Sequence, residues 1–235
     1  MKVLATTLGE TGGDFLSMSL GLGYLTSTAI FGFVFLFAVV FQIQSKGFHP
    51  LLYWVTIVAT TTLGTTLADF ATRSMGIGYM GGSSILLALV LISLVLWKHF
   101  TGSIAVHHVT DAKSEWFYWL TIMLSQTLGT AAGDWTADTL DCGYLGSAGI
   151  FSASLFILAV LHWKSSISSV WLFWAAFILT RPLGAVVGDF LDKPIDHGGL
   201  NLSRWLASLV IVGIMVILDG SFHKKQPSNF IREKK

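Results

Sequence analysis

Four aspartates in equivalent sequence contexts are the residues of this chain best suited to chemistry. Each stands five residues after a glycine and directly after a glycine or alanine, and an aromatic residue follows it. These motif aspartates are Asp14, Asp69, Asp134 and Asp189. Carboxylates that gather at one place repel one another, which favours the binding of a proton or a cation. Mg²⁺, Mn²⁺ and Ca²⁺ prefer oxygen ligands of this kind, so the four aspartates are predicted metal ligands.

Three further oxygen-bearing side chains extend the predicted cation or proton site. Glu10 precedes Asp14 by four residues, which places both carboxylates on one helix face. Asp134 and Asp138 have the same spacing and like charge, a pair that a cation or hydrogen bonds must relieve. The hydroxyl of Thr127 adds a neutral oxygen on the same helix. The alternative is that each motif aspartate only caps a helix end by accepting hydrogen bonds from backbone amides.

Two ion pairs are predicted from depth and spacing. Arg181 is the one basic residue well inside an apolar segment, and a buried arginine requires an acidic partner. Glu10 is the only acid at a comparable depth, so the two should pair and join the first and last parts of the chain. Asp69 and Arg73 have the four-residue spacing of an ion pair at a helix end. Both pairs are interpreted as structural.

The composition places the chain in a membrane. Of its 235 residues 53% are hydrophobic and 11% are charged, and the mean hydropathy is +0.70. Because these values are too apolar for a soluble domain of this length, the chain is predicted to be an all-α integral membrane protein. Its main partner is then the lipid bilayer. The net charge of +1 gives no sign of a nucleic-acid partner.

Other function classes find little support in the residues. The chain has one cysteine, Cys142, which excludes an internal disulfide, and its Cys and His residues lack the spacing of a zinc site. Because no signature of a hydrolase or metalloprotease is present, we do not expect an enzyme. No organic cofactor is expected, and a hard cation is the one bound ligand that the residues favour.

Eight apolar segments have about the 20 residues that a membrane-spanning helix needs. They show no alternation of polar and apolar residues, so the strands of a membrane barrel are excluded. Glycine-bearing turns join the segments in pairs. The predicted helices cover residues 3–20, 24–43, 51–72, 79–97, 116–138, 144–162, 169–191 and 200–218.

The spacing of the motif aspartates, 55, 65 and 55 residues, divides these helices into four two-helix repeats. Because every repeat holds two helices, all four enter the membrane in the same direction, as parallel repeats around a pseudo-symmetry axis. A single transmembrane domain, residues 1–220, precedes a basic cytoplasmic tail, residues 221–235. The repeats cover residues of about 1–45, 50–98, 115–163 and 169–219.

Tryptophans mark the cytoplasmic ends of the predicted helices. In three repeats a tryptophan stands nine residues before the leucine of the motif, and in the first repeat this position would precede Met1. We therefore expect a shortened first helix, and a chain that is truncated or that begins at an internal start. The tryptophans near helix ends are predicted to form an aromatic belt at the membrane interface. They are Trp54, Trp97, Trp116, Trp119, Trp163, Trp171 and Trp174.

The basic residues set the predicted orientation. Most lysines and arginines fall on the side of the two chain ends, so the positive-inside rule places both termini in the cytoplasm. We expect a multi-pass protein of the bacterial inner membrane. At about 1.5 Å per residue, the path from Leu51 to Asp69 is about 27 Å long, which places the motif aspartates near the outer boundary of the hydrocarbon.

Several of these segments resemble a known protein family. They are the run from Lys2 to Asp14, the spacing from tryptophan to Leu-Gly, and the segment from Phe177 to Gly184. The chain resembles, over essentially its whole length, a bacterial family of membrane proteins with four copies of a two-helix repeat of unknown function. It is more faintly similar to cation transporters whose repeats carry Glu-x-Gly-Asp, although Glu10 and Asp14 stand one residue further apart.

The leading functional hypothesis is a small transporter or exporter of a cation, either a divalent metal or an ion coupled to protons or Na⁺. In this hypothesis the motif aspartates and Glu10 bind the cation or carry protons. The alternative is a non-transporting membrane scaffold or regulatory protein in which the aspartates are structural caps.

Overall fold

The computed structural model describes residues 1–45, 49–106, 109 and 111–223. Most of the predicted tail, residues 224–235, therefore lies outside the described residues. The described residues form eight α-helices and no strand. The helices are α1 (Lys2–Asp14), α2 (Gly23–Gln44), α3 (Pro50–Asp69), α4 (Tyr79–Thr101), α5 (Ala112–Asp134), α6 (Gly143–Lys164), α7 (Ser169–Asp192) and α8 (Arg204–His223).

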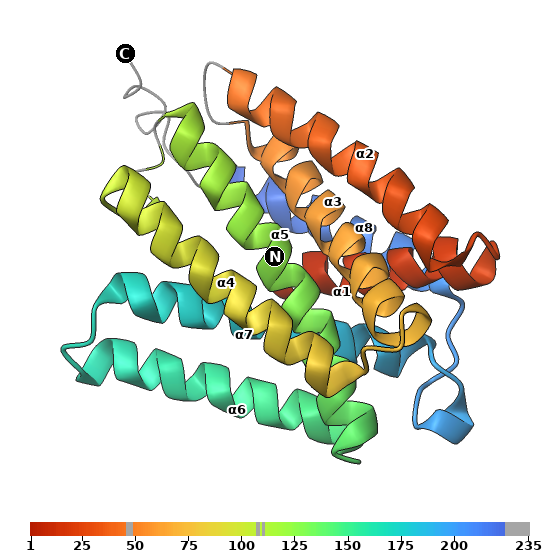
Figure 1. Ribbon diagram of the computed structural model, residues 1–235. Coiled ribbons are helices and arrows are strands. Elements are labelled where there is room, and N and C mark those ends of the chain that lie inside the picture. The colour runs from red at the N-terminus through yellow and green to blue at the C-terminus, as the bar shows by residue number, and fades with distance from the viewer. Residues whose placement is uncertain (46–48, 107–108, 110, 224–235) are drawn as a thin grey trace.

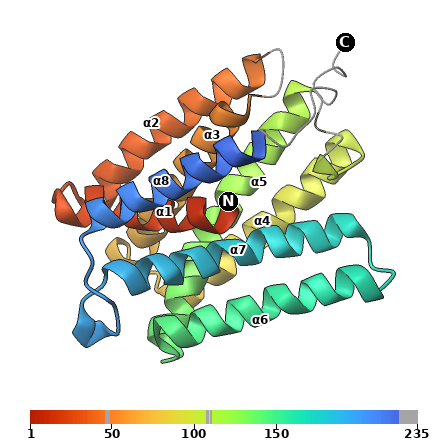
Figure 2. The same ribbon diagram turned by 180° about the vertical axis from the view of Figure 1, so that it is seen from behind.

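The first helices of the four repeats form an inner ring. α1 packs against α3, α3 against α5, α5 against α7, and α7 returns to α1 (Figures 1 and 2). The second helix of each repeat lies on the inner helix of the following repeat, so that α2 covers α3, α4 covers α5, and α6 covers α7. The last helix, α8, covers α1 and completes the circle. Each repeat therefore supplies one inner helix and a cover for its neighbour.

Glycines of the motif allow the inner helices to approach one another closely. A Cβ atom on Gly64 would lie 2.9 Å from the backbone nitrogen of Thr127, and a Cβ atom on Gly188 would lie 2.7 Å from Cβ of Glu10. Because no side chain fits, these positions require glycine. The first glycine of each motif meets the next inner helix at an equivalent residue. These contacts join Gly9 to Thr61, Gly64 to Gln126, Gly129 to Arg181, and Gly184 to Thr6.

The chain passes from inner to outer helix through an element that the sequence did not predict. In the first three repeats the helix continues past the motif aspartate for five residues as a π-helix. The segments are η1 (Phe15–Ser19), η2 (Phe70–Ser74) and η4 (Trp135–Thr139). π-Helical turns are rare and are frequent at functional sites. The predicted glycine turns follow these segments, and Gly21 and Gly23 hold φ angles of 67° and 74° that favour glycine.

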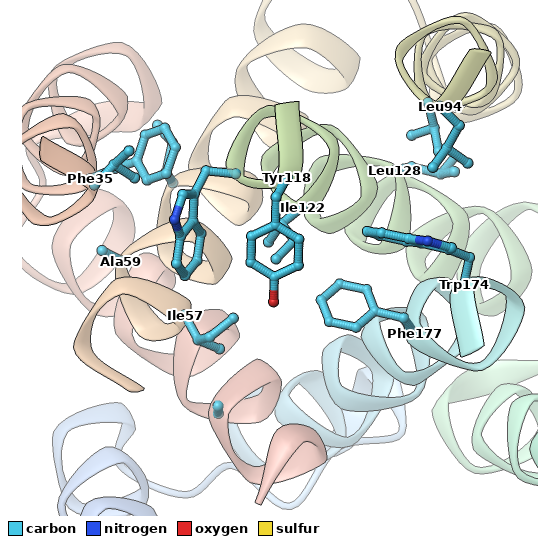
Figure 3. Packing of buried hydrophobic residues seen from close by; sticks show 14 of the residues in the cluster. Phe35, Ile57, Ala59, Leu94, Tyr118, Ile122, Leu128, Trp174 and Phe177 are labelled. Atoms are coloured by element: carbon cyan, nitrogen blue, oxygen red, sulfur yellow. The ribbon is translucent and has the colours of Figure 1, made fainter. Parts of the chain in front are cut away.

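Aromatic and aliphatic side chains fill the ring at the end away from the motif aspartates. Tyr118, Phe177 and Ile57 point into the middle of the ring from α5, α7 and α3 (Figure 3). The rings of Trp97 and Trp174 lie 5.6 Å apart, and the indole of Trp174 donates a hydrogen bond to the carbonyl of Ile104. This aromatic core closes that end of the ring among the described residues.

The aromatic belt prediction was therefore wrong for part of its members. Trp97, Trp119 and Trp174 are at most 1% exposed and pack in the core, whereas Trp116, Trp163 and Trp171 are exposed. The three buried indoles fill space between helices, which an interfacial residue would not do.

The outer surface is apolar on the covering helices. Phe33 on α2, Val95 on α4 and Phe156 on α6 are 80%, 66% and 69% exposed. Five helical segments are long and apolar enough to cross a membrane: 23–44, 50–74, 79–101, 143–164 and 169–192. Among the residues searched, α1 and α5 do not meet that criterion, and α8 is apolar over the shorter stretch Arg204–Leu218. Helix α5 packs against α3, α4 and α7, and most of its polar residues are buried among these helices.

Candidate functional site

The four motif aspartates come together at one end of the inner ring. Their side chains are each at most 3% exposed, and they stand on four different inner helices. Two basic side chains bridge them across the junctions between repeats. Arg73 Nε lies 3.0 Å from Asp69 Oδ1, and its Nη2 lies 3.2 Å from Asp134 Oδ2. The predicted pair of Asp69 and Arg73 thus extends to a second repeat.

Lys193 makes the equivalent bridge at the junction of the fourth and first repeats. Its Nζ lies 3.1 Å from Asp189 Oδ1 and donates a hydrogen bond to Asp14 Oδ2. Arg204 pairs with Asp192 beside it, with 2.6 Å between Nε and Oδ2. The sequence reasoning missed Lys193, although the residue follows Asp189 by the same four positions that separate Arg73 from Asp69.

Lys193 is held as a cation by its surroundings. The residue lies just beyond α7, where burial lowers the pKa of its ammonium group while the carboxylates of Asp189, Asp14 and Asp192 raise it. The balance leaves the pKa well above its usual value, so Lys193 is charged at neutral pH. Oxygen atoms of the three carboxylates lie within 4.8 Å of one another, a spacing that could hold a metal ion. In this structure the ammonium group of Lys193 contacts two of them.

Glu10 stands four residues before Asp14 and Arg181 eight residues before Asp189, and their charged groups meet between the inner helices. Arg181 Nη2 is 3.0 Å from Glu10 Oε2, and both side chains are at most 3% exposed. The same nitrogen donates hydrogen bonds of 2.6 Å and 2.5 Å to the hydroxyls of Thr65 and Thr130. Each inner helix thus supplies one polar group to this layer. Depth in the sequence had suggested the pairing of Glu10 with Arg181.

Two predicted ligands do not join these groups. The hydroxyl of Thr127 donates to the carbonyl of Met123 within its own helix, at 3.0 Å. Asp138 is exposed on the π-helix that follows Asp134, whereas Asp134 is buried and paired with Arg73. Thr65 and Thr130 provide the hydroxyls that face the axis instead.

The capping alternative predicted hydrogen bonds from backbone amides to the motif aspartates. Asp14, Asp69 and Asp134 stand where each π-helix begins, and none of these three side chains caps it. Their carboxylates contact lysine and arginine side chains instead. The aspartates therefore join repeats to one another, which local caps would not do.

These features define a class: a helical protein in which four two-helix repeats close into a ring, with apolar helices outside and buried charge at one end. The chain belongs to the family described as Repeat of Unknown Function (DUF347), which matches residues 1–48, 52–103, 117–168 and 172–221. This confirms the resemblance to a four-repeat family of unknown function. The matched segments contain the helix pairs α1–α2, α3–α4, α5–α6 and α7–α8. Comparison with curated proteins found no match, and no solved structure matches the chain.

Proposed function

We propose that this protein transports or exports a small cation across a bilayer, with the cation or a proton bound at the motif aspartates. The cation is a divalent metal or an ion coupled to protons or Na⁺. The proposal includes a location in the bacterial inner membrane with both termini in the cytoplasm. The apolar surface of the covering helices and the five segments long enough to span support it.

One observation carries the proposal: buried carboxylates outnumber the basic groups that contact them. The four motif aspartates share two basic side chains, Arg73 and Lys193, so the cluster holds a formal charge of −2 when every group is ionised. Glu10 and Arg181 neutralise each other. An unpaired buried charge costs several kcal/mol, so a divalent cation or protons that bind here lower the free energy.

The two ends of the ring support a carrier with alternating access. Arg73, at the charged end, is 31% exposed, so the charged cluster reaches the protein surface through this side chain, although the motif aspartates are buried. The aromatic core around Tyr118 and Trp174 closes the other end. A transport cycle would require this core to open in a second conformation, after which the cation leaves toward the cytoplasm or enters from it.

The scaffold alternative is favoured by a specific observation of its own. Every motif aspartate already contacts Arg73 or Lys193, and each of these two basic side chains joins two repeats. In that case the charges hold the ring together, and no ion crosses the membrane.

Cation flux into proteoliposomes separates the two functions. The purified full chain is reconstituted and offered Mg²⁺, Mn²⁺, Ca²⁺ and Na⁺ with and without a pH gradient. The double variant Asp134→Asn, Asp189→Asn is expected to reduce flux of the transported ion at least about tenfold, which corresponds to a rise of about 1.4 kcal/mol in the barrier to transport. Asp141→Asn is the matched control, because Asp141 is exposed at the same end and asparagine tolerates its φ of 55°. Absence of flux for every ion in the unmodified protein would favour the scaffold.

A further inference from the structure

One nitrogen of the Arg181 side chain lies inside a cage of oxygen atoms. This nitrogen, Nη2, lies 2.6 Å from the hydroxyl of Thr65, 2.5 Å from that of Thr130 and 3.0 Å from Glu10 Oε2. A fourth oxygen, the backbone carbonyl of Thr61, lies 3.3 Å away. The four oxygens come from α1, α3 and α5, and Arg181 reaches them from α7. Together they form an oxygen cage between the inner helices.

The oxygen cage offers more oxygen atoms than the guanidinium group can use. A terminal nitrogen of arginine carries two hydrogens, whereas four oxygens lie within 3.3 Å of Nη2. A spherical cation can contact all four at once. Only the oxygen of Glu10 belongs to an ionisable group, so the cage balances one positive charge. Because Ca²⁺ and Mg²⁺ usually take six or more oxygens, the oxygen cage fits a monovalent metal ion better.

Gln126 offers the guanidinium group a second place. The Gln126 side chain is fully buried, and neither its carbonyl oxygen nor its amide nitrogen has a hydrogen-bond partner among the described residues. Gln126 stands four residues before Thr130 on α5, and a Cβ atom on Gly64 would lie 3.0 Å from its Cβ. Gly64 in turn stands between Thr61 and Thr65 on α3. Gln126 therefore stands at the edge of the oxygen cage.

Arg181 has a hydrogen-bond donor left for this second place. Its Nε is buried and, within the part of the chain that the structure describes, has no hydrogen-bond partner. Buried polar groups are nearly always hydrogen-bonded, so an unpaired donor on Arg181 and an unpaired acceptor on Gln126 indicate a second arrangement of the two side chains. A turn of the guanidinium group toward Gln126 would free the oxygen cage and give both groups a partner.

The charge of the surroundings allows a second cation beside Arg181. The motif aspartates and their two basic partners carry a formal charge of −2, and Asp14 stands four residues after Glu10 on the same helix. This negative charge offsets the additional positive charge of an ion in the oxygen cage, because opposite charges attract strongly inside a protein.

We infer that the oxygen cage binds a monovalent metal ion, Na⁺ or K⁺, which displaces the guanidinium group of Arg181 toward Gln126. This inference rests on the proposed function and names the site of the coupling ion. In this structure Arg181 is a tethered cation at the place of the ion. The exchange changes the contacts of Arg181 with α1, α3 and α5, so ion binding is coupled to the packing of the inner helices.

Thermal unfolding of the purified full chain in detergent tests the inference. The midpoint is recorded in NaCl and in KCl against N-methylglucamine chloride of equal ionic strength, because N-methylglucamine is too large for the oxygen cage. In the unmodified protein one of the two metal salts should raise the midpoint saturably. In Arg181→Met the same salt should act at a concentration at least about tenfold lower, because the competing guanidinium group is gone. Glu10→Gln should abolish the response.

Gln126→Leu tests the displacement of Arg181 directly. The substitution removes the second acceptor, so the unmodified protein's response to the salt should require at least about tenfold more salt in this variant. In an Arg181→Met background the same substitution should have no effect on the response. Ser125→Ala is the matched control, because this buried neighbour donates its hydrogen bond to the carbonyl of Ile122 within its own helix. Gln126→Leu keeps the ion pair of Glu10 with Arg181, so it decides the question even if Arg181→Met does not fold.

Two results would overturn the inference. One is the absence of a saturable response to both metal salts in the unmodified protein. The other is a response that either Arg181→Met or Gln126→Leu leaves unchanged, because the ion would then bind elsewhere or without displacing Arg181.

Cation flux into proteoliposomes decides the proposed function separately. Flux of a divalent cation without any response to Na⁺ or K⁺ would keep the transport proposal and reject the oxygen cage as an ion site. The expected response without flux of any ion would keep the oxygen cage as a binding site and reject transport.

Discussion

The buried pair of Glu10 and Arg181 permits a quantitative test of how the ring is held together. Arg181→Met keeps most of the side-chain volume that packs against Gly129 but leaves the Glu10 carboxylate on the axis without its cation. Removing one partner of a buried pair costs about 3–5 kcal/mol. Glu10→Gln should be costly for the same reason, because the Arg181 guanidinium then keeps its threonine contacts and loses its counter-charge.

The double variant Glu10→Gln, Arg181→Met removes both charges together. Its remaining losses are the hydrogen bonds that Arg181 donates, each worth about 0.5–1.5 kcal/mol. Their acceptors are on Thr6, Thr61, Thr65 and Thr130. Additive single losses would reach about 6–10 kcal/mol, whereas the structure predicts a double variant no less stable than Arg181→Met alone. The coupling free energy should therefore be several kcal/mol in favour of the double variant.

Unfolding in detergent provides the measurement. Tryptophan fluorescence reports on the aromatic core, because Trp97, Trp119 and Trp174 are buried there. Equilibrium unfolding in increasing SDS gives the free energy for the unmodified protein, both single variants and the double variant. Strictly additive losses would refute the reasoning, since they would mean that Glu10 and Arg181 contribute independently of each other.

Two other substitutions test the helix contacts and the charged end. Gly64→Ala should lower the free energy of unfolding in SDS by about 1–3 kcal/mol, because the added Cβ would lie 2.9 Å from the backbone of Thr127. Gly149→Ala is the control, because a Cβ at this position meets no atom within 4 Å. This control variant should be as stable as the unmodified protein in the same measurement. Lys193→Met should lower the thermal unfolding midpoint measured in the presence of a chelator, because three carboxylates with oxygens within 4.8 Å of one another lose their ammonium partner. Added Ca²⁺ should then raise the midpoint of this variant more than it raises the midpoint of the unmodified protein. A Lys193→Met midpoint that is insensitive to Ca²⁺ would show that these carboxylates do not form a metal site even when the lysine is removed.

The sequence predicted the helices and repeats well because two strong signals carry them. Apolar length defines each helix, and the aspartate motif recurs at a fixed place at the end of every inner helix. The position of Arg181 deep in its helix predicted an ion pair with Glu10, because a buried guanidinium requires an acidic partner at a comparable depth. These predictions needed only the position of a residue along its helix.

Predictions that needed the direction of a side chain were less successful. Thr127 and Thr130 both lie close to the face of α5 that carries Asp134, seven and four residues before it, and the crossing of the helices decides that Thr130 turns to the axis. Trp97 resembles an interfacial residue in sequence, but α4 packs on the helix of the following repeat and carries the indole into the core. The sequence also gave no signal for the π-helices, whose backbone form depends on how inner and outer helices meet.

The outer helix of each repeat packs on the inner helix of the next repeat, and this arrangement constrains how many repeats such a protein can have. In a solenoid, units can be added or deleted, because each contacts only the unit before and after it and the ends stay open. Here α8 must reach back to α1, so the eighth helix of the ring lies against the first. The first two repeats alone, α1–α4, would expose the faces of α1 that α7 and α8 normally bury and the face of α3 that α5 buries. The number of repeats is thus fixed by closure, and evolution by gain or loss of a single repeat would require a ring of different geometry.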